Sequence, residues 1–451
     1  MSGCSARRAP EYLLCLVVGS LVACTEAEPL PVAQAHAGSH APRSDSGIPQ
    51  ATAGRPASAQ GPTDAAAGSI AGDSAIGDAA GWPGADEDAG VMEPDSYSWR
   101  LPPGFPEPVV PQDNPMTEAK VQLGRRLFYD KRLSDNQTMS CASCHDQRLA
   151  FTDGLAHSQG ATGEPHPRSA MSLANVAYAA SLTWANPLFA IGVLREPIER
   201  QTMIPMYGDT PVELGLTSQA QIEGRLQAVA QYVDWFSQAF PGQPQPVTAQ
   251  NINRALAAFE RTLISGSSPF DRYAQGLDPD ALSESAKRGH ALFDSERLAC
   301  SQCHSGFNFS DHVYYRDRKS IELVYHNTGL YNIDGLGAYP EPNTGVYGVT
   351  LDPDEMGMFK APTLRNIALT APYMHDGSIP TLNEVIDHYA AGGRTLVGGP
   401  HAGVGSDNPY KDSRLKGFSL SAQERADLIA FLMSLTDQAF TEDAAFSDPW
   451  L

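Results

Sequence analysis

Apolar residues recur at helical spacing along much of the chain, and three such segments stand out. Two of them precede cysteine pairs: LGRRLFYD at residues 123–130 and KRGHALFD at residues 287–294. The third is LNEVIDHYAAGG, residues 382–393, which ends in glycines. Its start carries a capping-box pattern from Thr381 to Glu384. The spacing predicts a mainly α fold with long loops.

The first 24 residues have the pattern of a signal peptide. Arg7 and Arg8 give a charged start, and the apolar run YLLCLVVGSLVA is too short for a comfortable membrane span. The chain is therefore expected to be exported. The sequence LVAC that ends this run is similar to a bacterial lipobox, which would make the protein a periplasmic-side lipoprotein anchored at Cys24. The alternative is an ordinary signal followed by a chance cysteine.

Residues 25–97 have the composition of a disordered tether. Ala, Gly, Pro, Ser and Asp dominate, so the segment cannot bury enough apolar surface to offset the entropy of ordering. The formal net charge of −21 argues against a nucleic-acid partner and favours attraction of basic partners. No later apolar run could span a bilayer, so membrane contact is expected only through the lipid anchor.

The seven cysteines divide into three in the leader and two pairs in the rest of the chain. The pairs form the sequences CASCH at 141–145 and CSQCH at 300–304. Each pair is followed at once by histidine, the pattern of covalent haem c attachment with an imidazole ligand to the iron. The residues concerned are Cys141, Cys144 and His145 for the first haem, and Cys300, Cys303 and His304 for the second. A zinc site would need further Cys or His ligands nearby, and neither motif has them.

The two attachment motifs lie in a weak internal repeat. Both follow a basic, glycine-containing helical segment that ends in Leu-Phe and Asp, which suits two tandem cytochrome c-like modules. Proline and glycine interrupt the chain near residues 268–285, where Asp and Ser clusters indicate a helix start. We therefore expect haem domains at 98–280 and 281–451.

The second axial ligand of the second haem would determine its character. A methionine thioether raises the reduction potential and suits electron transfer, whereas an anionic phenolate favours ferric or higher states. Several side chains after CSQCH could serve, and residue chemistry alone leaves the choice open. The candidates include Met356, Met358, Met374, Met433, His375, His388 and Tyr389.

The segment FKAPTLRNIALTAPYMHDGSIPTLNEVIDHY resembles the second-domain signature of the bacterial di-haem cytochrome c peroxidase and MauG superfamily. In that signature the peroxidases place an axial Met fourteen residues after the histidine of the HDG-like turn. Counted from His375, that position is Tyr389, and MauG and its relatives have Tyr there. The resemblance therefore implies His304 and Tyr389 as ligands of the second haem iron. The alternative is a tyrosine that only packs its helix.

The first domain resembles the same superfamily in the residues around its haem pocket. Glu213 in PVELG matches the distal glutamate, and Gln201 and Pro205 keep the spacing of the Gln and Pro that line the pocket. Trp184 in LTWAN aligns with the tryptophan between the two haems. The resemblance implies catalytic roles for all four residues. A helix-entry carboxylate and an ordinary buried tryptophan are the alternative interpretations of Glu213 and Trp184.

A departure from the peroxidases concerns the resting state of the first haem. Their mobile loop carries a histidine that ligates this iron, and the corresponding position here is Ala161. His157 and His166 are nearby but out of register. The resemblance therefore implies an open, five-coordinate first haem with His145 as its protein ligand, ready for hydrogen peroxide without reductive activation.

Four further residues are assigned supporting roles by the resemblance. Arg168 and Arg365 are expected to pair with haem propionates, with surface charge as the alternative. Thr370 and Pro372 match backbone ligands of an inter-haem calcium ion, although Ser169 replaces the asparagine that usually completes that site.

The expected activity follows the MbnH-type branch of MauG relatives, which the chain most resembles. Such an oxidase uses hydrogen peroxide to reach a high-valent di-haem state that oxidises a residue, first of all a tryptophan, of a small exported partner protein. The second expectation is a di-haem cytochrome c peroxidase that takes electrons from small redox proteins. A non-enzymatic tandem electron-transfer cytochrome, with both irons closed, is the alternative of another class.

Overall fold

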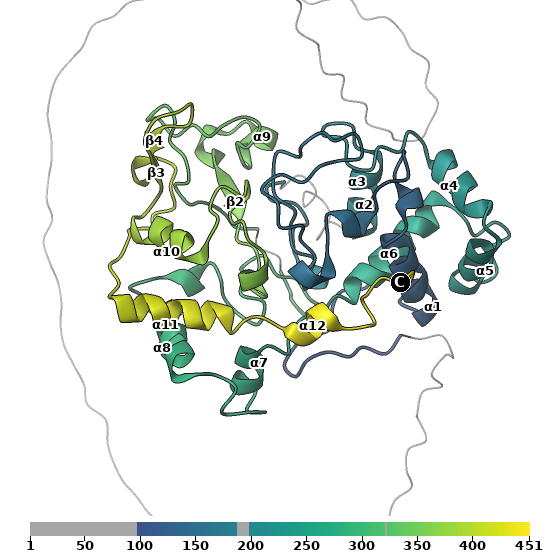
Figure 1. Ribbon diagram of the computed structural model, residues 1–451, viewed down its shortest axis with the longest axis horizontal. Coiled ribbons are helices and arrows are strands. Elements are labelled where there is room, and N and C mark those ends of the chain that lie inside the picture. Colours follow the sequence, from purple (N-terminus) through teal and green to yellow (C-terminus); the bar gives the residue numbers. More distant parts are fainter. Residues whose placement is uncertain (1–96, 187–197, 321–322) are drawn as a thin grey trace, which may run out of the picture. The chain divides into compact units, whose positions relative to one another are not determined.

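The computed structural model describes residues 97–186, 198–320 and 323–451 (Figure 1). The predicted signal peptide, the Cys24 anchor and all of the tether except Tyr97 lie outside the described residues. No described helix is long and apolar enough to cross a membrane.

Helices predominate over strands among the described residues, as the sequence predicts, but long irregular segments make up more of the chain than the helices do. The α-helices are α1 (Glu118–Phe128), α2 (Ile198–Gln201), α3 (Met203–Tyr207), α4 (Gln219–Gln227), α5 (Ala230–Ala239), α6 (Ala249–Arg261), α7 (Pro269–Ala274), α8 (Glu284–Phe293), α9 (Tyr347–Thr350), α10 (Leu382–Ala390), α11 (Ala422–Met433) and α12 (Gln438–Glu442). Two antiparallel ribbons join β1 (Tyr325–Asn327) to β2 (Met358–Lys360) and β3 (Thr395–Leu396) to β4 (Gly403–Val404). The strands are too short to form a sheet core.

The predicted helix start at residue 381 is confirmed, and α8 begins within residues 268–285, where the sequence predicts a helix start. The Thr381 hydroxyl accepts a hydrogen bond from the Glu384 backbone N–H at 3.2 Å, and the Glu384 carboxylate accepts one from the Thr381 N–H at 3.1 Å. This reciprocal capping box starts α10. Ser283 caps α8 by accepting from the Ala286 N–H at 3.1 Å. Both helices therefore begin where a side chain satisfies the free N–H groups of the first turn.

The internal repeat corresponds to two pairs of crossing helices, α1 with α6 and α8 with α11. A glycine lies at each crossing. A Cβ on Gly124 would lie 1.9 Å from the Ala255 carbonyl oxygen, and a Cβ on Gly289 would lie 1.9 Å from the Asp427 carbonyl oxygen. Only glycine allows backbones to approach so closely. The repeated glycine of the sequence therefore has the same packing role in both halves.

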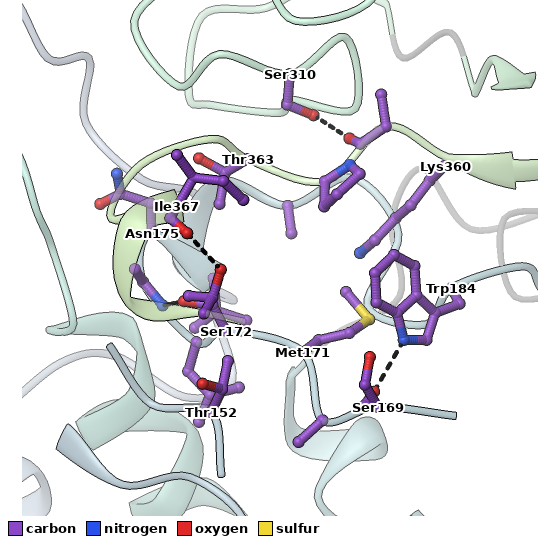
Figure 2. Close-up of a pocket in the computed structure, with 18 of the residues that line it drawn as sticks. Thr152, Ser169, Met171, Ser172, Asn175, Trp184, Ser310, Lys360, Thr363 and Ile367 are labelled. Carbon is purple, nitrogen blue, oxygen red and sulfur yellow. Dashed lines mark hydrogen bonds between the residues drawn. The ribbon is translucent and has the colours of Figure 1, made fainter. Parts of the chain in front are cut away.

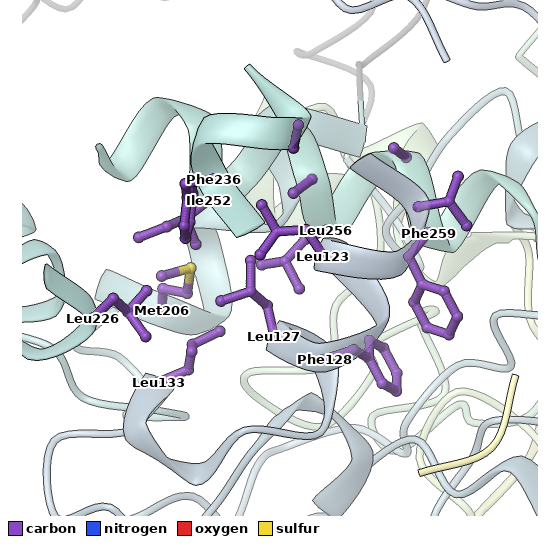
Figure 3. Packing of buried hydrophobic residues seen from close by; sticks show 14 of the residues in the cluster. Leu123, Leu127, Phe128, Leu133, Met206, Leu226, Phe236, Ile252, Leu256 and Phe259 are labelled. Atoms are coloured by element: carbon purple, nitrogen blue, oxygen red, sulfur yellow. The ribbon is translucent and has the colours of Figure 1, made fainter. Parts of the chain in front are cut away.

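Aromatic pairs fill both crossings in the same way. Figure 3 shows Leu123, Leu127 and Phe128 of α1 packed beside Leu256 and Phe259 of α6. The Phe128 and Phe259 ring centroids lie 5.3 Å apart, and those of Phe293 and Phe431 at the second crossing lie 5.1 Å apart. Edge-on and tilted contacts of this kind add to the apolar burial. Each half therefore has its own helix-pair core next to its attachment motif.

Replacing Gly289 by Ala is expected to lower the free energy of unfolding by about 1–3 kcal/mol, since the added methyl group meets backbone at the α8–α11 crossing. Gly224→Ala is the matched control. Gly224 is exposed on α4 with nothing within 4 Å of the added Cβ, so the helix should gain about 0.5–1 kcal/mol. Denaturant unfolding of the holo-protein measures both free energies of unfolding. Equal stability of the two variants would show that the α8–α11 crossing does not require a glycine.

Both ends of the described chain pack across the two halves. Near the start, the Phe105 ring lies 6.1 Å from Tyr178 and 4.9 Å from Phe307. At the other end, Phe440 of α12 belongs to the core of the first half, and the Tyr129 hydroxyl donates to the Phe446 carbonyl at 2.7 Å. The predicted domain limits stay a prediction, but the residues after α11 pack with the first half.

Candidate haem sites and the space between them

Both cysteine pairs lie in short 3-10 turns next to buried histidines. The turns span Cys141–Ser143 and Cys300–Gln302. All four cysteines are free thiols, so no disulfide competes for them. Burial raises the pKa of the Cys144 and Cys300 thiols to about 12, which keeps both protonated near neutral pH.

The two histidines are oriented by backbone carbonyl groups. His145 Nδ1 lies 2.8 Å from the Phe151 carbonyl oxygen, and His304 Nδ1 lies 3.2 Å from that of Phe309 and 3.1 Å from that of Pro362. A proton on Nδ1 donates to these carbonyls and leaves Nε2 free as a ligand. Burial lowers the pKa of both imidazoles, which favours the neutral form that binds iron.

A first cavity adjoins the CASCH turn and brings together residues from across the first half. It is lined by Cys141, Cys144, His145, Arg168, Trp184, Gln201, Pro205 and Glu213, together with His166 and Glu260. Every residue that the sequence assigns to the first haem therefore lines one cavity. Ala161 is not in this lining, but its backbone N–H donates to the Glu213 carbonyl oxygen at 2.6 Å and so holds the loop that carries Glu213.

The environment of Glu213 suits acid–base chemistry near neutral pH. Burial raises the pKa of its carboxyl group to about 7. Its Oε1 lies 3.6 Å from His166 Nε2, and both side chains are about one-third exposed. A carboxyl group with a pKa near the working pH can both accept and return a proton.

Two residues of the first cavity were missed by the sequence interpretation. His166 lies beside Glu213 although its register excluded it as the peroxidase-type ligand. Glu260 is buried on α6, and burial raises the pKa of its carboxyl group to about 8. Its place in the sequence, between Phe259 and Arg261 on a strongly amphipathic helix, could have indicated a buried carboxyl group.

The two predicted propionate partners have different environments. Arg168 lines the first cavity, its Nε donates to Asn343 Oδ1 at 3.0 Å, and no described carboxylate pairs with it. Burial lowers the pKa of its guanidinium, so a bound carboxylate would stabilise its charge.

The prediction for Arg365 is wrong. Its guanidinium donates to both oxygens of Asp271 at 2.8 and 2.9 Å, and also to the Phe307 carbonyl. The side chain is buried and lines none of the three cavities described here. Arg365 therefore forms a bidentate ion pair that ties the start of α7 to the second half, and its donors are not available to a propionate.

A second cavity adjoins the CSQCH turn and narrows the choice of ligands. It is lined by Cys300, Cys303, His304, Met374, His375 and Tyr389, among others. Met356, Met358, Met433 and His388 do not line it. Tyr389 reaches it from the last turn of α10, and burial raises the pKa of its phenol. His388, one residue earlier, packs away from it.

Tyr389 is well placed among the remaining candidates. Tyr389 and His375 both line the cavity, and the His375 ring is stacked on Phe359 with ring centroids 3.7 Å apart. The geometry is consistent with a ligand role for Tyr389.

A middle cavity shares lining residues with both the first and the second cavity, and Trp184 borders all three cavities. Figure 2 shows its indole beside Met171, with the indole N–H donating to the Ser169 carbonyl at 3.1 Å. Ser169, Thr370 and Pro372 all line the middle cavity. The Thr370 and Pro372 carbonyl oxygens accept no hydrogen bond from the described residues. The residues predicted for a calcium site therefore surround one space and offer free hard oxygen ligands.

Polar atoms without a hydrogen-bond partner among the described residues line the first and second cavities, which indicates that each cavity holds a bound group. Ser158 Oγ, Thr183 Oγ1 and Gln201 Oε1 at the first cavity, and His375 Nε2 at the second, are buried without a described hydrogen-bond partner. Such atoms normally have a partner, so each cavity fits a group that is not protein. With the thiols and oriented imidazoles, the residues present fit a covalent haem c at each motif.

Comparisons with known proteins agree with this geometry. The model of the di-haem cytochrome c peroxidase family matches residues 118–278, and that of a RoxA-like, cytochrome c-like family matches residues 358–390. The methylamine utilization protein MauG of Methylorubrum extorquens is 34% identical over 78% of this chain and 86% of its own. A cytochrome-c peroxidase of Pseudomonas sp. strain SCT is 36% identical over 78% of this chain and 89% of its own.

A solved structure extends the agreement to the fold. A MauG-like protein associated with microbial copper homeostasis is 48% identical, with a TM-score of 0.76, and the match covers 79% of this chain and all of that one. Each of these three relatives matches more than three quarters of this chain. The chain therefore belongs to the di-haem cytochrome c peroxidase and MauG family of peroxide-dependent oxidoreductases, whose members carry two haem c groups.

Proposed function

We propose that this protein is a MauG-like oxidase that reacts with hydrogen peroxide at the first cavity and oxidises a residue of a partner protein by way of the second. One observation carries the proposal: Trp184 borders both haem cavities and the space between them. His145 would hold the first haem, and His304 with Tyr389 the second. When bound, the two haems supply the two-electron redox chemistry that peroxide reduction requires.

Glu213 would move the proton that makes peroxide a leaving group. With its pKa near 7, the carboxylate accepts the proton of the inner peroxide oxygen and returns it to the outer oxygen, so that water leaves. His166 Nε2 lies 3.6 Å from the Glu213 carboxylate, and both side chains are about one-third exposed, so the imidazole can exchange protons with the carboxyl group. Gln201 and Pro205 complete the wall of the cavity on the α2 and α3 side.

Tyr389 and Trp184 would separate the oxidising equivalents from the site of peroxide binding. If Tyr389 and His304 both held the second haem, the phenolate of Tyr389 would favour ferric and higher oxidation states over ferrous iron. The Trp184 indole is held in place by the hydrogen bond from its N–H to the Ser169 carbonyl oxygen. It would carry electrons between the first and second cavities, both of which it borders. An oxidant held in this way can act on a protein that never enters the first cavity.

Trp184→Phe tests the proposal. In the wild-type holo-protein, one equivalent of hydrogen peroxide should change the absorption of both haems together. In the variant, the change at the second haem should lag at least about tenfold, since the bridging indole is lost. Trp235→Phe is the control, because the Trp235 ring makes a tilted contact with Trp450, with ring centroids 6.0 Å apart, and borders no cavity described here. A synchronous change in Trp184→Phe would show that electrons do not need this residue.

The second candidate is a conventional peroxidase fed by small redox proteins. Cytochrome-c peroxidases match the chain as well as MauG does, and the net charge of −21 would attract basic cytochromes. The 48% identity with a MauG-like protein favours the oxidase. That protein's association with copper homeostasis suggests a small exported, copper-handling protein as the partner, with tryptophan as the first choice of oxidised residue.

Three further assignments belong to the same proposal. The protein is exported to the periplasmic side, and Cys24 carries its lipid anchor. A calcium ion binds in the middle cavity to the carbonyl oxygens of Thr370 and Pro372, with Ser169 or water as a further ligand. The non-enzymatic electron-transfer cytochrome has no support among the relatives, which are named as enzymes or resemble them.

A further inference from the structure

A series of aromatic rings runs outward from the second cavity. Phe359 and His375 line that cavity and stack on each other with centroids 3.7 Å apart and planes at 11°. The Tyr339 ring follows, 6.4 Å from Phe359 and 6.5 Å from His375. A Cβ on Gly357 would lie 2.2 Å from the Tyr339 ring, so the backbone there is built around this ring.

The series continues to the surface through Tyr331. Its ring lies 5.5 Å from Tyr339 on the inner side and 5.6 Å from the exposed His401 on the outer side. Tyr331 itself is buried, with 6% of its surface exposed. His401 belongs to the loop between β3 and β4, the hairpin labelled in Figure 1. Neighbouring rings therefore connect the second cavity to this hairpin without a gap.

Tyr331 differs from the other tyrosine of the series in its hydrogen bond. Its hydroxyl donates to Asp376 Oδ2 at 2.7 Å, whereas the Tyr339 hydroxyl donates to the amide oxygen of Asn327 at 2.8 Å. A phenol that loses an electron becomes a strong acid, so its oxidation requires a nearby proton acceptor. A carboxylate can accept that proton and an amide oxygen cannot.

The charges around Tyr331 favour joint loss of an electron and a proton. The buried Asp376 carboxylate also accepts a hydrogen bond from the Ser378 N–H at 3.1 Å. Burial opposes ionisation of this carboxyl group, but its hydrogen bonds to Tyr331 and Ser378 help to hold its pKa below the ordinary value, so it is ionised and can accept a proton. The Arg394 guanidinium lies 6.0 Å above the Tyr331 ring and disfavours a positive charge there. A neutral tyrosyl radical beside a protonated Asp376 avoids that repulsion.

We propose that Tyr331, with Asp376 as its proton acceptor, relays electrons from the surface at His401 to the second cavity. The inference rests on the proposed function, which supplies hydrogen peroxide as the oxidant. One electron passes from Tyr331 through Tyr339 and the Phe359–His375 stack to the oxidised haem site, and the phenolic proton passes to Asp376. An external donor then returns one electron to Tyr331, and the proton returns from Asp376.

Radical detection in the peroxide-treated holo-protein tests the relay without any partner. Wild type, Tyr331→Phe, Tyr129→Phe and Asp376→Asn receive one equivalent of hydrogen peroxide and are frozen for EPR spectroscopy. Parallel samples receive a nitroso spin trap, and fragment sequencing locates the adduct. Tyr129→Phe is the matched control, since it removes a half-buried phenolic hydroxyl that donates to the Phe446 carbonyl at 2.7 Å, and Tyr129 belongs neither to the ring series nor to any of the three cavities.

The relay predicts a tyrosyl signal and a trapped adduct at Tyr331 in wild type and in Tyr129→Phe. Both should be absent in Tyr331→Phe and reduced at least about tenfold in Asp376→Asn. An oxidised haem spectrum in wild type without any adduct at Tyr331 would overturn the relay and leave the proposed function standing. If peroxide produces no oxidised haem spectrum in wild type, the proposed function itself fails.

Discussion

Replacing Glu213 by Gln is expected to slow the reaction with hydrogen peroxide by about 10²–10⁴-fold, the usual contribution of a positioned acid–base group. The amide keeps the shape of the side chain but cannot accept the proton of the inner peroxide oxygen. Rapid-mixing absorption spectroscopy under excess peroxide gives the rate constant directly. Glu164→Gln is the control, because Glu164 is an exposed carboxylate near the same loop that does not line the first cavity.

The same residue predicts the pH dependence of the reaction. Burial raises the pKa of Glu213 from its ordinary value near 4.5 to about 7, and only the carboxylate form can accept a proton. The wild-type rate constant should therefore rise with pH and level off above about pH 7, while the Gln variant loses this step. A wild-type profile that is flat from pH 5.5 to 8.5, together with a fast Gln variant, would assign the proton transfer to another group.

Replacing Tyr389 by Met is expected to abolish the long-lived oxidised form of the protein. A thioether opposite His304 raises the reduction potential of the second haem, so the site no longer holds an oxidising equivalent. The resting spectrum should change from a mixture that includes a His/Tyr low-spin haem to one with a His/Met haem. Spectra before and after one equivalent of hydrogen peroxide measure both effects.

Tyr373→Phe provides the matched control for this substitution. Tyr373 is a second tyrosine that lines the second cavity, and its hydroxyl already donates to the Ile367 carbonyl at 3.2 Å. Its loss should leave the resting spectrum and the oxidised form unchanged. If Tyr389→Met keeps the wild-type spectrum and lifetime while Tyr373→Phe changes them, Tyr389 only packs its helix.

Local chemistry could be predicted from the sequence because it depends on residues close together in the chain. The attachment turns and the Thr381–Glu384 capping box each lie within five residues, so their patterns are visible without the fold. The roles of Tyr389 and Trp184 were inferred by matching the chain to the motifs of the family, and the residues that line the cavities are consistent with these roles. Neither role is derivable from periodicity alone.

Other features depend on contacts between distant segments. The sequence suggests a propionate partner for Arg365 because a guanidinium pairs with carboxylates. Its actual partner, Asp271, is 94 residues away, and no pattern in the sequence links the two residues. His166 reaches the first cavity because its loop folds back beside Glu213, 47 residues later in the chain. The sequence shows the repeated glycine, but the reason for it is the close approach of Gly289 to the backbone of α11, which only the fold reveals.

The most direct test of the central claim is the response of the ferric wild-type holo-protein to one equivalent of hydrogen peroxide, followed by absorption and EPR spectroscopy. The account predicts a resting mixture of a high-spin haem and a His/Tyr low-spin haem, and loss of both signals into a long-lived oxidised form. A resting protein with two closed haems, or a methionine-ligated haem with no lasting response to peroxide, would contradict it.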